Sequence, residues 1–122
     1  MALIYLLSAQ PELPGPGKRG EPLREAFNYA SHVAAYAILA LFAWRASQTL
    51  PMALENARTQ NLGIAVFTIL YAITDELHQS FVPGREASLL DILADAVGML
   101  LCLATIAALR FQRRARLPDR HG

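Results

Sequence analysis

The chain has 122 residues, which fits a single domain spanning residues 1–122. Hydrophobic residues make up 54% of it and charged residues only 17%, against roughly 25% in soluble domains, so the composition argues against an ordinary soluble domain. The formal net charge of +1 gives no reason to expect a nucleic acid partner, and the single cysteine, Cys102, excludes an intrachain disulfide and a cysteine-rich metal site.

The N-terminal segment, residues 1–9, is apolar but far shorter than the roughly 20 residues needed to cross a bilayer. It has no basic region and no usual cleavage site, so we do not expect a signal peptide. We interpret it as the end of a first helix that is truncated in this sequence. Residues 10–22 are rich in Pro and Gly and predict an irregular loop.

The first predicted membrane helix covers residues 27–44, which are apolar except for a few polar side chains. Asn28, His32 and Tyr36 are spaced four residues apart and therefore share one helical face. Trp44, followed by a basic residue, is typical of an anchor at the membrane interface.

A polar connection over residues 47–60 leads to the second predicted helix, residues 62–82, which is close to one bilayer thickness. Its first turns carry no charge. Its last turns carry four polar side chains that are candidates for chemistry: Asp75, Glu76, His78 and Gln79. Pro83 and Gly84 end the helix, because Pro disfavours a helical residue before it and Gly allows a tight turn.

The third predicted helix covers residues 88–109 and follows a short turn, so the second and third helices form an antiparallel hairpin. Ser88 has the side chain of a helix N-cap. Asp91 and Asp95 lie one turn apart and face the same way. Gly98 continues toward that side and permits close packing against another helix.

The basic residues predict an orientation in the membrane. If the C-terminus is cytoplasmic, seven basic residues lie inside and four outside, as the positive-inside rule requires. The inner set is Arg45, Arg58, Arg110, Arg113, Arg114, Arg116 and Arg120, and the outer set is Lys18, Arg19, Arg24 and Arg85. The polar residues of all three helices then meet at one level near the outer face.

The placement of the charged residues also favours a membrane bundle. Ionisable residues at membrane depth persist mostly where they face a bundle interior and have a function. A soluble four-helix bundle is the alternative, but residues 62–73 and 96–109 lack the charged face that its helices require.

This polar cluster can support acid–base chemistry on an anionic, lipid-linked substrate. Asp75 or Glu76 would act as acid or base and His78 as a proton carrier, while Arg85 in the turn would clamp the anion. A proton-linked or cation site is equally compatible with these side chains. The candidate catalytic residues are Asp75, Glu76, His78, Gln79 and Asp91, and the candidate substrate-binding residues are Arg85, His32, Tyr36 and Asp95.

The sequence leaves open whether a metal or another cofactor is bound. The candidate ligands are Asp75, Glu76, His78, Asp91 and Asp95. Their spacing is not the two-histidine pattern of helical zinc proteases, and one imidazole with carboxylates suits several divalent ions.

Structural roles are the alternative for each residue taken alone. Arg85 can pair with Glu86 or Asp91 to pin the hairpin. Asp75 can simply pair with Arg85, and Glu76 can face the outer interface. His32 can be a hydrogen-bonded packing group, and Asp91 can serve only to cap a helix.

The same residues carry a resemblance to a known family. Residues 75–88, Asp91 and Gly98, together with His32 and Tyr36 and the opening at residues 5–10, resemble the VanZ-like family over nearly the whole chain. The resemblance implies a small bacterial membrane protein, usually of four or more helices, that acts at the cell envelope. The family's founding member is linked to low-level resistance to teicoplanin.

The resemblance also implies which residues matter. The family's motif residues fall on His32, Asp75, Glu76, His78, Gln79, Arg85 and Asp91. Asn28 and Tyr29 stand where the family usually has Asp-Lys, and Asp95 stands where it usually has Asn. These departures make the site of this chain more negative.

The sequence therefore predicts an all-α, polytopic transmembrane bundle with three full spans and a short, truncated first helix. We expect it in the bacterial inner membrane with a cytoplasmic C-terminus, in contact with membrane lipids and an anionic envelope substrate. A non-enzymatic membrane scaffold and a small proton- or cation-coupled transporter are the alternatives, and the oligomeric state is not predicted.

Overall fold

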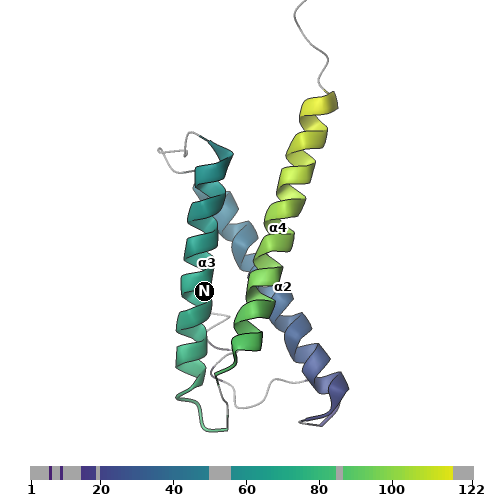
Figure 1. The fold of residues 1–122 in the computed structure, drawn as a ribbon, viewed down its shortest axis with the longest axis vertical. Coiled ribbons are helices and arrows are strands. Elements are labelled where there is room, and N and C mark those ends of the chain that lie inside the picture. Colours follow the sequence, from purple (N-terminus) through teal and green to yellow (C-terminus); the bar gives the residue numbers. More distant parts are fainter. Residues whose placement is uncertain are drawn as a thin grey trace, which may run out of the picture.

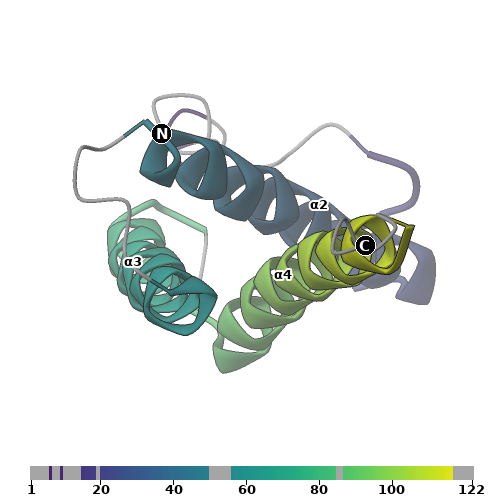
Figure 2. The same cartoon turned by 90° about the horizontal axis from the view of Figure 1, so that it is seen from above.

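A computed structural model gives the fold of this chain as helices only, within the part that it describes. It describes residues 6, 9, 15–18, 20–49, 56–84 and 87–116. The helices are α2 (Pro22–Ser47), α3 (Ala57–Gln79) and α4 (Leu89–Arg116). Each helix packs against the other two, and Figure 2 shows α3 and α4 on the same side of α2. The expected short N-terminal helix lies largely outside the described residues.

The chain runs up, down and up again. The ends of α2 and α4 and the start of α3 lie toward the upper end of Figure 1, and the α3–α4 hairpin lies at the lower end. The predicted hairpin is thus confirmed. At its turn Gly84 has a φ of 84°, a conformation that residues with a Cβ rarely adopt.

Helix α2 begins five residues before the predicted start. Pro22 stands in the first turn of the helix, where its missing N–H is no loss and its fixed φ is already helical. The sequence pattern assigned Pro22 to the loop, which explains the error. The predicted end was three residues early.

The bounds of α3 and α4 also differ from the predicted ones. The side chain of Asn56 caps α3 by accepting a hydrogen bond from the Thr59 N–H at 2.8 Å, so this helix starts before residue 62. It ends at Gln79, and the three residues before Pro83 form the turn instead. Helix α4 continues through the arginines to Arg116, because cations are favourable in a last helical turn.

Helices α2 and α4 come into backbone contact at Gly98. A Cβ at this position would lie 2.2 Å from the carbonyl oxygen of Val33, closer than real Cβ atoms come to any neighbour. The expected close packing at Gly98 is confirmed, and Val33 directly follows His32 on α2. This contact therefore sets how near the polar face of α2 lies to that of α4.

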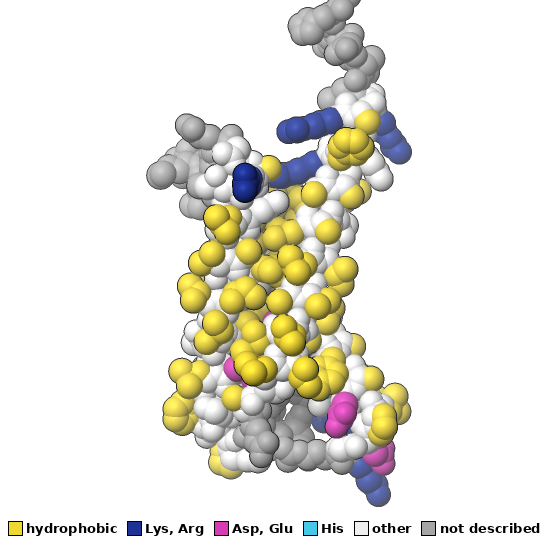
Figure 3. Space-filling model, in the orientation of Figure 1, with side chains coloured by type: hydrophobic (Ala, Val, Ile, Leu, Met, Phe, Trp, Pro, Cys, Tyr) yellow, Lys and Arg dark blue, Asp and Glu magenta, His cyan; other side chains and the backbone are white. Residues whose placement is uncertain are grey.

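The interior of the bundle is small and its outside is apolar. Buried apolar side chains form two clusters, Ala40, Ile64, Met99 and Leu103, and Tyr36, Leu39 and Ala72. Large side chains such as Phe42 and Leu100 are 64% and 58% exposed, whereas Thr68 is fully buried. Hydrophobic side chains cover the middle of the face drawn in Figure 3. An exposed apolar surface of this extent is typical of contact with lipid.

Two described helices, α2 and α4, are long and apolar enough to cross a membrane. Only 17% and 28% of the residues in their apolar stretches are buried, which is unlike the core helix of a soluble protein. Helix α3 is not apolar enough along its length to be counted with them, and polar residues stand near both of its ends. Three full spans therefore remain a prediction.

A polar network joins the three helices at the end opposite the hairpin. Arg110 of α4 lies over the ring of Trp44 at 5.2 Å and donates a hydrogen bond to Gln60 Oε1 at 3.2 Å. Gln60 in turn donates to Ser47 Oγ at 2.7 Å. These contacts fix the spacing of the helices at the end that carries the arginines of α4.

Candidate functional site

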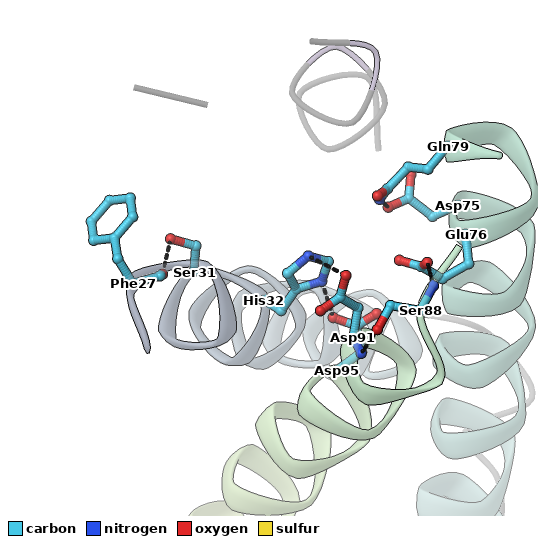
Figure 4. Close-up of polar contacts among 9 residues, drawn as sticks. All are labelled: Phe27, Ser31, His32, Asp75, Glu76, Gln79, Ser88, Asp91 and Asp95. Carbon is cyan, nitrogen blue, oxygen red and sulfur yellow. Dashed lines mark hydrogen bonds and ion pairs between the residues drawn. The ribbon is translucent and has the colours of Figure 1, made fainter. Parts of the chain in front are cut away.

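The site is built at the hairpin end of the bundle, where the three helices bring polar side chains together (Figure 4). Helix α2 contributes His32, α3 contributes Glu76, and α4 contributes Asp91 and Asp95. The prediction that these residues meet at one level is confirmed by their contacts.

His32 lies at the centre, between two carboxylates of α4. Its Nδ1 is 2.9 Å from Asp95 Oδ1, and its Nε2 is 3.8 Å from Asp91 Oδ2. The two acids stand one helical turn apart, so they reach opposite nitrogens of the ring. Asp95 is 1% exposed and the His32 side chain 10%, so the shorter contact is partly buried. His32 thus ties α2 to α4.

Glu76 links α3 to the start of α4. Its Oε2 accepts a hydrogen bond from the Ser88 N–H at 2.8 Å, which satisfies a backbone group just before the helix. Its Oε1 has no hydrogen-bond partner among the described residues, although the residue is only 3% exposed. Glu76 therefore faces the bundle interior, and the alternative that it faces the outer interface is wrong.

Asp75 and Gln79 form a second, neighbouring pair on α3. The Gln79 amide donates to Asp75 Oδ2 at 3.0 Å, one helical turn away, and both side chains are buried. This contact places the two residues on one face of α3. Glu76, rather than Asp75, shares the central group with His32 and Asp91.

The remaining predicted site residues are Tyr36, His78 and Arg85. Tyr36, one turn after His32, is 1% exposed, and its hydroxyl has no hydrogen-bond partner within the described part of the chain. Its ring packs against Tyr71 with centroids 6.3 Å apart. His78 is half-buried and does not belong to the central group. Arg85 lies outside the described residues.

Ligand atoms of His32, Glu76 and Asp91 all lie within 4.8 Å of one another. Sequence reasoning named both acids as candidate metal ligands but did not count His32 among them. The signal was present, because His32 lies on a helical face at the same predicted depth as the acids. What the sequence does not contain is the rotation of α2 about its axis, which decides where that face points.

Burial of the acids in this site costs free energy. Glu76, Asp91 and Asp95 surround one imidazole, and two of these acids are almost fully buried. Burying a carboxylate without compensation costs several kcal/mol. Part of this cost is offset by the His32–Asp95 and Glu76–Ser88 contacts.

Ser88 has the predicted capping role. Its Oγ accepts from the Asp91 N–H at 3.4 Å, as an N-cap side chain does. Asp91 consequently has two roles, in the first turn of α4 and beside His32.

Comparison with known proteins gives one match. The family model described as VanZ/LLP1 matches residues 4–110, which include all of the site residues described above. No curated protein and no solved structure matches the chain.

Proposed function

This chain belongs to the VanZ/LLP1 family, and we propose from that premise that it is a multi-pass protein of the bacterial inner membrane. In this proposal α3 is a third span beside α2 and α4. The site centred on His32 binds or acts on an anionic envelope component, either lipid-linked or related to peptidoglycan.

The observation that carries the proposal is the burial of acids from α3 and α4 around a histidine of α2. Asp95 and Glu76 are 1% and 3% exposed, while large apolar side chains of the same helices face outward. Such an arrangement is expensive at membrane depth and persists mostly where it has a function.

The arginines support the orientation of the site. Four arginines of α4, together with Arg45 and Arg58, belong to the end of the bundle away from the hairpin. By the positive-inside rule this end is cytoplasmic. The site then lies near the outer face, where envelope precursors are used.

The geometry favours different chemical roles from those predicted for the two histidines. In our proposal His32, held between Asp91 and Asp95, carries the proton that the sequence assigned to His78. Glu76, whose Oε1 has no hydrogen-bond partner among the described residues, is the acid or base. Arg85 keeps its predicted role as an anion clamp, on the family resemblance alone.

A contribution to glycopeptide resistance follows from the same resemblance. We expect the wild-type chain, expressed in a sensitive host, to lower its susceptibility to teicoplanin. The Glu76→Gln and His32→Asn variants, at matched membrane levels, are expected to lose this protection, because they remove the ionisable groups and keep the side-chain shapes close. The minimum inhibitory concentration is the measurement.

The matched control is Glu25→Gln, which changes an exposed acid in the first turn of α2. It is expected to protect like the wild type. The alternative favoured by the His32–Asp95 and Glu76–Ser88 contacts is a scaffold in which these residues only hold the helices together. Protection that survives both site variants would support the scaffold and end the proposal of a chemical site.

A further inference from the structure

We propose that His32, Glu76 and Asp91 form a binding site for a divalent transition-metal ion such as Zn²⁺ or Mn²⁺. The three ligands come from α2, α3 and α4, one from each helix. Binding of the ion is a property of the chain alone, and it does not depend on the proposed envelope role.

The distances suit one shared ion. Two atoms bound to one Zn²⁺ at roughly 2.1 Å in tetrahedral geometry lie about 3.4 Å apart. His32 Nε2 and Asp91 Oδ2 are 3.8 Å apart, and all three ligand atoms lie within 4.8 Å of one another. Closing the group around an ion requires shifts of about an ångström, which carboxylate rotation supplies.

The orientation of His32 is that of a metal ligand. A histidine bound to a metal almost always donates its second ring N–H to a carboxylate or carbonyl. Here Nδ1 is engaged by Asp95 at 2.9 Å, and Nε2 is left facing Asp91 at a distance too long for a hydrogen bond. Asp95 would thus position the imidazole without touching the ion.

Glu76 supplies an independent observation. Its Oε2 is held by the Ser88 N–H, but its Oε1 is buried without a hydrogen-bond partner within the described residues. Figure 4 shows this second oxygen on the side of the carboxylate that faces His32 and Asp91. Because a buried, unsatisfied carboxylate oxygen is costly, its position calls for a bound group.

The donor set indicates the class of ion. One imidazole with two carboxylates suits first-row ions such as Zn²⁺ and Mn²⁺, whereas Ca²⁺ and Mg²⁺ prefer oxygen ligands alone. Three protein ligands leave at least one position open, as catalytic zinc sites do. The Asp91 side chain, 16% exposed, is the least buried of the group, so the open position lies on its side.

The open position would accept an oxygen of a phosphate or carboxylate. This last step rests on the proposed function, since it takes the ion as the group that holds the anionic substrate. Metal binding itself is tested without any substrate, so the two proposals fail separately.

The test is metal binding by the purified full chain in detergent after removal of metals with EDTA. Zn²⁺, Mn²⁺ and, as an optical probe, Co²⁺ are titrated by calorimetry and visible absorption. We expect one ion per chain with the wild type. His32→Asn and Glu76→Gln are expected to weaken binding at least 100-fold, and Asp95→Asn by about 10- to 100-fold, as a change beside a ligand does.

The controls are Glu25→Gln, an exposed acid in the first turn of α2, and Ser31→Ala, which removes a hydroxyl bonded to Phe27 O of the same helix. Neither residue belongs to the group, and both variants are expected to keep wild-type affinity. If His32→Asn does not fold, Asp91→Asn, at a less buried position, replaces it. Failure of the folded wild type to bind any of the three ions, or equal binding by ligand variants and controls, would overturn the proposal.

Discussion

The Gly98→Ala variant is expected to lose more stability than any other variant of this protein that adds a single methyl group. The new Cβ would lie 2.2 Å from the carbonyl oxygen of Val33 and 3.0 Å from its Cα. The Val33 backbone cannot relieve the clash by changing rotamer as a side chain does, so α2 and α4 must move apart. Overpacking a well-packed interior usually costs about 1–3 kcal/mol, and a clash with backbone belongs at or above the upper end of that range.

Thermal unfolding of the purified protein in one detergent measures this effect. Gly63→Ala is the matched control, because Gly63 is an exposed glycine inside α3. There alanine is expected to stabilise the helix by roughly 0.5–1 kcal/mol, since glycine loses more conformational freedom on folding. Equal melting temperatures for Gly98→Ala and wild type would mean that α2 and α4 do not cross at this point.

The His32→Ala variant is expected to be strongly destabilised for an electrostatic reason. It removes the partner of Asp95, which is 1% exposed and whose second oxygen already lacks a hydrogen bond among the described residues. Breaking a buried pair by removing one member typically costs about 3–5 kcal/mol, because the remaining charge is left uncompensated.

A double-mutant cycle of His32→Ala and Asp95→Ala, in the presence of EDTA, isolates this interaction. We expect the double variant to be more stable than the sum of the single effects predicts. Interhelical hydrogen bonds in membranes average about 0.6 kcal/mol with a maximum near 1.7 kcal/mol, so a larger coupling energy identifies a charged pair. Ser31→Ala, which removes only a hydroxyl bonded to Phe27 O of the same helix, is the control. If the stability losses of the two single variants simply add in the double variant, His32 and Asp95 do not stabilise each other.

The three described helices and the hairpin were predictable because their signals are local. Apolar runs of bilayer length mark α2 and α4, and Pro83 with Gly84 marks the turn between α3 and α4. The bounds were less predictable. Proline is common both in loops and in the first turn of a helix, so the sequence around Pro22 is compatible with either, and the structure places it in the first turn of α2.

The composition of the site was predictable, but its connections were not. Periodicity places His32 on one face of its helix and Asp91 and Asp95 on one face of theirs. It does not give the rotation of each helix about its axis, on which the His32–Asp95 contact depends. For the same reason His78 was predicted to be the proton carrier, whereas the structure places His32 among the acids.

The proposed function depends most on the placement of the hairpin end, and with it the site, at the outer face of the membrane. Cysteine labelling tests this in a Cys102→Ala background, with either Phe81→Cys in the hairpin or Phe111→Cys in α4. The two phenylalanines are 77% and 74% exposed, and they lie in the turn after α3 and among the arginines of α4, at opposite ends of the bundle. The reagent is a membrane-impermeant maleimide applied to intact cells without an outer membrane. We predict labelling of the Phe81→Cys chain in intact cells and of the Phe111→Cys chain only after permeabilisation. The reverse pattern would contradict an outer placement of the site.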